Sequence, residues 1–149
     1  MLDFFKRLPP WHATLWLVAA STVLRLAAGA SIGLGTDEAH YALYGLHLDW
    51  SYYDHPSMIG WLQALALQFA DSNLALRVIP ILLFSAASLV LYRLALTLFP
   101  QESPWLGFTS VALLQSAVMF QLIGISMLPD TPLLLLGLLA LLAAAASRD

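Results

Sequence analysis

The chain has 149 residues, of which 60% are hydrophobic and only 10% are charged, and its formal net charge is -3. Soluble domains carry roughly 25% charged residues, so this composition excludes an ordinary soluble domain and predicts a surface that faces lipid. No basic cluster indicates nucleic-acid binding, and the absence of cysteine excludes disulfides and thiolate metal sites.

Four apolar segments have the composition of membrane-crossing helices, which need about 20 residues each. In chain order they are about 13–32, 78–99, 105–128 and 131–147. We therefore expect an all-α membrane protein, a polytopic helix bundle with about four crossings. Lys6 and Arg7 precede the first segment as they would in a signal peptide, but the apolar run exceeds the core of about 7–15 residues typical of such peptides. An uncleaved first helix is the preferred interpretation, and cleavage is the alternative.

A long polar stretch, about residues 33–77, separates the first two segments. Within it, residues 59–70 are apolar but too few to cross a membrane, so we expect a helix that lies in the interface or a re-entrant piece. Two short turns, 100–104 and 127–132, separate the later segments.

The distribution of Lys and Arg predicts the orientation. With four crossings, Lys6, Arg7, Arg93 and Arg148 share one side, which the positive-inside rule places in the cytoplasm. Arg77 falls on the other side, so the rule is satisfied only in part. The N-terminus is then cytoplasmic, and the long loop lies on the outer side of what the Leu/Ala-rich composition suggests is a bacterial inner membrane.

The predicted outer face collects most of the acidic residues and three of the four histidines. These residues are Asp37, Glu38, His40, His47, Asp49, Asp54, His55, Asp71 and Asp130. An outer loop must be polar, so solvation alone can explain Asp49 and Asp71. Residues that abut membrane segments are stronger candidates for function, because charge is costly there.

Three motifs stand out, each with a structural alternative. Thr36 or Asp37 can cap a helix, or Asp37 can act as a general base at a membrane-facing cleft. In Tyr52–Pro56, the proline favours an extended His55, and the Asp54–His55 pair can bind a divalent cation or a phosphate. The alternative for this motif is an interfacial loop anchored by its tyrosines.

The third motif is Pro129–Pro132, in which Asp130 is either a helix N-cap or a site residue. Arg25 and Arg77 can extend toward lipid headgroups or pair with a carboxylate or a phosphate. Arg25 needs a partner more, because it lies deeper in its segment. The sequence has no P-loop, Rossmann glycine pattern, nucleophile elbow or HExxH motif.

Taken in order, these motifs resemble the N-terminal third of membrane glycosyltransferases related to protein O-mannosyltransferases (glycosyltransferase family 39), which the lipid A aminoarabinose transferase also resembles in fold. The motifs are Arg25, Thr36–Tyr41, Tyr52–Pro56, Arg77 and Leu128–Leu135. The resemblance implies a GT-C fold and an enzyme that moves a sugar from a polyprenyl-phosphate carrier to an acceptor hydroxyl on the outer side, with inversion.

The resemblance also implies roles for particular residues. Asp37 corresponds to the catalytic base, and Asp54 to an acid that contributes to a metal or donor site. The expected substrate-binding residues are Glu38, Tyr41, His55, Arg77 and Asp130. A divalent metal cation is the one cofactor allowed for. The expected partners are membrane lipids, the polyprenyl-phosphate-sugar donor and a lipid or protein acceptor, with no nucleic acid.

Two departures from the family pattern bear on these expectations. Ser57 stands where the family has a second proline, which affects the local loop geometry. Family members also continue for several hundred residues, so we expect 1–149 to be the N-terminal portion of a longer domain and inactive alone. The alternative is a non-catalytic multipass membrane fragment or subunit that binds a polyprenyl lipid.

Overall fold

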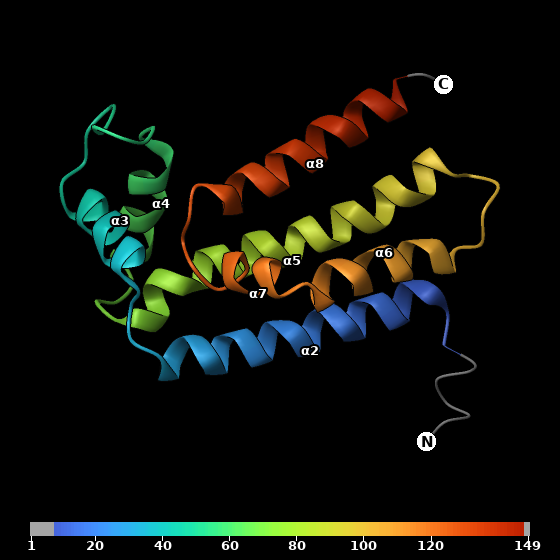
Figure 1. Ribbon diagram of the computed structural model, residues 1–149, viewed down its shortest axis with the longest axis horizontal. Helices are drawn as coiled ribbons and strands as arrows, with labels where there is room; N and C mark the ends of the chain where they lie inside the picture. Colours follow the sequence, from blue (N-terminus) through green and yellow to red (C-terminus); the bar gives the residue numbers. More distant parts are fainter. Residues whose placement is uncertain (1–7, 148–149) are drawn as a thin grey trace.

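The computed structural model describes residues 8–147, and these residues form an all-helical fold (Figure 1). Its helices are α2 (Pro10–Ser31), α3 (Thr36–Leu46), α4 (Met58–Leu67), α5 (Asn73–Leu98), α6 (Trp105–Ser116), α7 (Val118–Ile123) and α8 (Asp130–Ala146). Within this part of the chain the only β-type pairing is an isolated bridge between Ser51 and Pro56.

Four of the helices run side by side, with α5 in contact with α2, α6 and α8 (Figure 1). The short helices α3 and α4 pack on each other at one end of this bundle, where α2 ends and both α5 and α8 begin (Figure 1). The two stretches predicted to share the outer face, 33–77 and 127–132, therefore do lie at the same end. The predicted apolar segment 59–70 becomes α4, a helix of 10 residues.

The all-α membrane fold is confirmed. Helices α2 and α5, with 22 and 26 residues, have the length and apolar composition that a membrane crossing requires. The four-crossing topology stays a prediction. Lys6, Arg7 and Arg148, on which the predicted orientation depends, lie outside the described residues.

The third predicted segment, 105–128, is not one helix. Helix α6 ends at Ser116, Ala117 is extended with φ -77° and ψ 119°, and α7 then runs only to Ile123. The side chain of Gln121 donates to the backbone carbonyl of Gln115, so a side chain takes the place of a regular helical bond at the break. A hydropathy pattern cannot predict this break, because it does not show that a side chain bonds to a backbone carbonyl.

Helix α5 begins five residues before the predicted segment, at Asn73. The side chain of Ser72 accepts a hydrogen bond from the Ala75 N–H at 3.1 Å, which satisfies one of the free donors at the start of the helix. This early start places Arg77 inside the helix, near the end of the bundle that carries α3 and α4.

Two buried clusters hold the fold together. Val18, Tyr92 and Val111 join α2, α5 and α6, whereas the second cluster lies beneath the polar end of the molecule. In this second cluster Tyr41 of α3, Ile59 of α4 and Met127 pack together, and all three are at most 7% exposed. The segment before α8 is thereby fixed against the α3–α4 pair.

Gly45 allows α3 to approach α4 closely. A Cβ atom at this position would lie 2.8 Å from Gln63 Cβ and 2.9 Å from the Ala64 backbone nitrogen. We expect Gly45→Ala to push the two helices apart and to lower the free energy of unfolding by about 1–3 kcal/mol, as overpacking does. Thermal unfolding in detergent micelles measures this loss.

Gly137→Ala in α8 is the matched control, because a Cβ atom there meets nothing within 4 Å. Alanine in an open helical position should leave stability unchanged or raise it by up to about 1 kcal/mol. Equal melting temperatures for the two variants would contradict the close approach of α3 and α4.

Candidate active site

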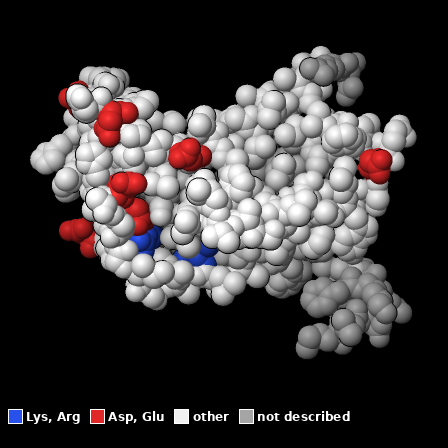
Figure 2. All heavy atoms as spheres, in the orientation of Figure 1, with Lys and Arg blue, Asp and Glu red and all other residues white. Residues whose placement is uncertain are grey.

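Acidic side chains gather at the end of the molecule formed by α3 and α4 (Figure 2). Burial raises the pKa of Tyr41, and the negative charges of Asp37, Asp54 and Asp130 raise it further. These acids come from α3, from the loop that follows it and, much later in the sequence, from the start of α8. The fold therefore places three of the four predicted site acids near one buried phenol.

His55 connects Tyr41 to Asp54. Its Nε2 lies 3.2 Å from the Tyr41 hydroxyl, and its Nδ1 lies 3.1 Å from Asp54 Oδ2. The Tyr41 and His55 rings also meet edge to face, with their centroids 5.1 Å apart. The contact between His55 Nδ1 and Asp54 Oδ2 is not aligned as a hydrogen bond, since Nδ1 is buried without a hydrogen-bond partner. Each nitrogen of this imidazole therefore has one polar neighbour, Tyr41 or Asp54. The sequence motif had grouped His55 with Asp54 but not with Tyr41.

Asp54 is held as a carboxylate. A hydrogen bond from the Tyr44 hydroxyl lowers the pKa of Asp54, and His55 lowers it further against an opposing effect of burial. The same bond, with burial and the negative charge of Asp54, raises the pKa of Tyr44 to about 12. The Tyr44 hydroxyl also lies 2.7 Å from His40 Nε2. His40 and His47 are exposed as predicted, but His40 belongs to this network, which the sequence pattern did not indicate.

Among residues 8–147, no group of three or more His, Cys, Asp or Glu side chains is arranged to hold a metal ion. Asp54 has two imidazoles nearby, with His40 Nε2 at 3.6 Å and His55 Nδ1 at 3.1 Å, but it also accepts from Tyr44. These residues do not make a metal site by themselves. A metal at Asp54 therefore stays a prediction.

Glu38 and Arg77 form a buried ion pair, with side chains 8% and 4% exposed. Arg77 donates from Nε to Glu38 Oε1 at 2.8 Å and from Nη2 to Oε2 at 2.6 Å. Its remaining N–H groups bind three backbone carbonyls at the end of α2, those of Gly29, Ile32 and Gly33, at 2.6–3.0 Å. All five guanidinium donors are engaged, so the geometry favours a positioning role over the predicted substrate binding.

Glu38 also organises the start of α3. Its Oε2 accepts the Gly35 N–H at 2.9 Å, and Gly35 is the N-cap residue of the helix. Burial raises the pKa of Glu38, but hydrogen bonds from Arg77 and Gly35 and the charge of Arg77 outweigh burial and lower it. The predicted caps Thr36 and Asp37 are therefore wrong, because they lie inside the first turn. Asp37 is exposed there and has no capping bond.

The start of α8 also differs from one prediction. Pro129, not Asp130, is the N-cap residue, and no side chain caps this helix. The hydroxyl of Thr131, which sequence reasoning did not single out, donates to the carbonyls of Ile123 at 2.8 Å and Ser126 at 3.0 Å. Thr131 is fully buried, so this bond fixes the turn that presents Asp130.

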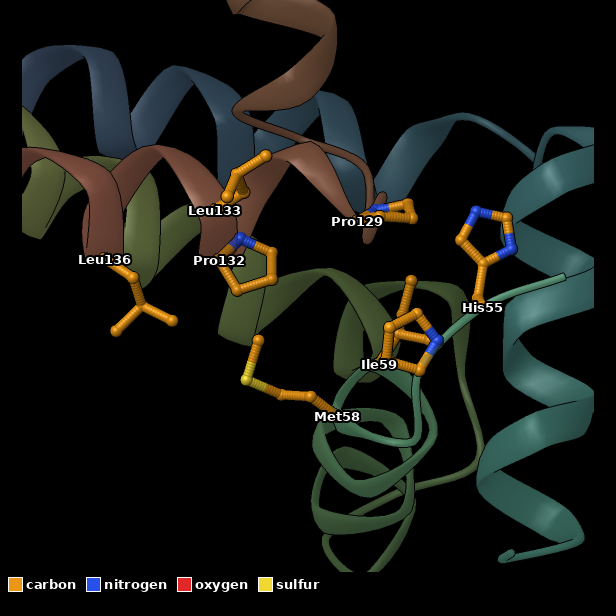
Figure 3. A pocket seen from close by; sticks show the side chains of 8 residues that line it. His55, Met58, Ile59, Pro129, Pro132, Leu133 and Leu136 are labelled. Atoms are coloured by element: carbon orange, nitrogen blue, oxygen red, sulfur yellow. The ribbon is translucent and has the colours of Figure 1, made fainter. Parts of the chain in front are cut away.

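An apolar cavity of about 230 Å³ lies beside His55. Its lining residues are His55, Pro56, Met58, Ile59, Pro129, Pro132, Leu133 and Leu136. Figure 3 shows that the side chains from the start of α8 and those from the start of α4 point toward the same space. No sequence signal marked this cavity, because its apolar residues resemble ordinary membrane and core residues one by one.

Arg25, which was expected to need a partner, is 3% exposed in the middle of the bundle. Its Nη2 donates to the side-chain oxygens of Gln115 at 2.5 Å and Gln121 at 2.7 Å. It therefore binds neutral amides, and it neither extends to the surface nor pairs with a carboxylate among the described residues.

The helical membrane fold and the acidic end with its apolar cavity are compatible with a membrane glycosyltransferase of the GT-C type. A family model described as dolichyl-phosphate-mannose-protein mannosyltransferase matches residues 54–147, which is more than half of the chain. The chain belongs to this family. No curated protein and no solved structure matches the chain. The match includes Asp54, His55 and Asp130, whereas Asp37 precedes it.

Proposed function

We propose that this chain contributes the donor end of an enzyme that transfers a sugar from a polyprenyl-phosphate carrier to an acceptor hydroxyl on the outer face of a bacterial inner membrane. The observation that carries the proposal is the apolar cavity with His55 at its edge, directly beside the Asp54 and Tyr41 side chains. A lipid phosphate has the same two parts, an apolar chain and a charged head.

The cavity suits the isoprenoid part of the donor. Its lining side chains are apolar apart from His55, and two of them, Leu133 and Leu136, are 64% and 50% exposed on α8. Exposed leucines on a membrane helix face lipid, so an isoprenoid chain can enter from the bilayer without crossing water. This arrangement favours a lipid-linked sugar over a water-soluble sugar nucleotide.

The polar end of the cavity suits the phosphate. The contact between His55 Nε2 and the Tyr41 hydroxyl is long, at 3.2 Å, so a phosphate oxygen can replace the phenol at small cost. The imidazole of His55 lies between Asp54 and the cavity, where a ring N–H can donate a hydrogen bond to the departing phosphate. A divalent cation at Asp54, if bound, would supply further positive charge there.

The transfer itself needs one base. As the bond between the anomeric carbon and the phosphate oxygen breaks, the acceptor oxygen bonds to the same carbon from the opposite face, which inverts its configuration. The hydroxyl proton passes to a carboxylate on the acceptor side, and the phosphate leaves with the electron pair of the broken bond. Asp37 is the proposed base, because it is an exposed carboxylate without a capping bond next to the cluster around Tyr41.

His55→Asn tests this proposal in the complete native protein, assayed in membranes with labelled polyprenyl-phosphate sugars. We expect kcat/KM for the lipid donor to fall about 100-fold, as it does when a donor to a developing negative charge is removed. The matched control is His47→Asn, whose exposed imidazole lies outside the cluster and should leave transfer unchanged. Full activity of His55→Asn, or transfer from a sugar nucleotide instead, would sink the proposal.

A second candidate, a non-catalytic subunit that binds a polyprenyl lipid, draws support from the cavity alone, which needs no base. The two functions differ in one measurement. That measurement is sugar transfer by the complete native protein. A lipid-binding subunit would bind polyprenyl phosphate but transfer no sugar, whether residue 37 is Asp or Asn.

A further inference from the structure

Arg25 is a charged group where charge is costly. It lies in α2, one of the two helices suited to cross a membrane, and it is 97% buried. Within the described residues no carboxylate pairs with it, and its Nε and Nη1 are buried without a hydrogen-bond partner. Buried N–H groups without partners call for an explanation, and the groups that the guanidinium does contact supply one.

The guanidinium holds the break in the third apolar segment. Gln115 and Gln121, whose side chains both accept from Nη2, stand on either side of the extended Ala117. Gln115 also donates to Ser88 of α5 at 3.0 Å, and the guanidinium carbon lies 4.4 Å from the centre of the Phe84 ring. Arg25 thus connects α2, α5, α6 and α7 at a single point.

The space around Arg25 is fitted to this contact. A Cβ atom at Gly124, directly after α7, would lie only 2.9 Å from Arg25 Nε. Helix α7 can therefore approach the guanidinium because glycine stands at this position. The close approach directs the chain into the turn at 124–129, which Thr131 and the buried Met127 then fix.

This turn and the start of α8, which follows it, form one wall of the cavity beside His55, through Pro129 and Pro132. We propose that Arg25 is a positioning residue: by fixing the break at Ala117, it places Pro129 and the first turn of α8 against the start of α4 and so shapes the donor cavity. The expected effect on sugar transfer rests on the proposed function. The effect of Arg25 on the position of the cavity wall does not, and it can be tested separately.

Cross-linking tests the placement directly. The chain has no cysteine, so Met58→Cys and Leu136→Cys, two lining positions on opposite sides of the cavity, introduce a unique pair. Any cysteine elsewhere in the complete native protein is replaced by serine. We expect a short bifunctional maleimide to join this pair in membranes, and the yield to fall severalfold when Arg25→Met is added.

Two further variants separate positioning from simple stability. Arg25→Lys keeps the charge but loses the planar fork, so it should fold and give an intermediate cross-linking yield. The triple variant Arg25→Met, Gln115→Leu and Gln121→Leu replaces the whole polar network by apolar groups, which restores stability but not the break. Its cross-linking yield should stay low. We expect kcat/KM for the donor to fall about 100-fold in both Met variants, mainly through KM for the donor.

Each outcome decides the matter. An unchanged cross-linking yield in Arg25→Met overturns the proposal, and so does a triple variant that recovers both the yield and the transfer activity. If the yield falls as expected but the native protein transfers no sugar from any polyprenyl-phosphate donor, then Arg25 still positions the cavity and the proposed function is the part that fails.

Discussion

Arg77→Met is expected to be the most destabilising single substitution in the described chain. It leaves the Glu38 carboxylate buried without its cation and leaves the carbonyls of Gly29, Ile32 and Gly33 without a donor. Breaking a buried ion pair by removing one partner costs about 3–5 kcal/mol. For a chain of this length the melting temperature should fall by roughly 10 °C, measured in detergent micelles.

Arg93→Met is the matched control on the same helix. Arg93 is exposed, and its guanidinium carbon lies 5.8 Å from the centre of the Trp11 ring. An exposed cation–π contact is worth about 0.5–1 kcal/mol, so the control should lose little stability. Similar decreases in melting temperature for the two variants would show that the ion pair of Arg77 with Glu38 does not stabilise the fold as its bonds suggest.

The pair also predicts how stability depends on pH. Its bonds lower the pKa of Glu38 below that of an unfolded chain, so the pair stabilises the fold at pH values above the ordinary carboxyl pKa of about 4.3. This stabilisation is lost as the pH falls through the lowered pKa of the folded state. Arg77→Met should therefore show a weaker loss of stability on acidification than the native chain.

Asp37→Asn is expected to have the largest effect on activity. The amide cannot take the proton of the acceptor hydroxyl, and general-base catalysis contributes about 10²- to 10⁴-fold to rates. We expect kcat to fall within that range in the complete native protein, with KM for the donor nearly unchanged, because the proposed base faces the acceptor. The fold should survive, since Asp37 is exposed and makes no capping bond.

Asp71→Asn is the control for Asp37→Asn. Asp71 is an exposed acid in the same polar stretch, and solvation alone accounts for it. Loss of transfer in both variants would point to a general effect of surface charge, and retained transfer in Asp37→Asn would remove Asp37 from the role of base.

Much of the architecture could be predicted from local pattern, because apolar segments with few charges have few alternatives to a helix in a membrane. The convergence of Asp37, Asp54 and Asp130 was also predictable, since the order of crossings places their segments on one side. A local sequence pattern cannot show which side chains from different helices will bond to one another. The break at Ala117 depends on amide groups of Gln115 and Gln121 that meet Arg25 only after four helices have assembled.

The roles of Glu38 and Arg77 illustrate the same limit. Both residue types at the membrane edge are typical of phosphate or substrate contacts, and their positions fit that interpretation. Only the folded chain shows that three carbonyls at the end of α2 accept the remaining N–H groups of the Arg77 guanidinium. The apolar cavity was hidden for a different reason, because its residues carry no chemical signal one at a time.

The bonds of Arg77 also have a consequence for biosynthesis. The last carbonyls of α2 and the carboxylate of Glu38 are synthesised 39 to 48 residues before the arginine that satisfies them, as the numbering of each bonded pair shows. A nascent chain that has inserted α2 must therefore leave these groups in water until α5 enters the membrane beside it. The α3 end can therefore dock onto α2 only after Arg77 has reached it, so a released chain truncated before residue 77 should leave the α3 segment open to proteases.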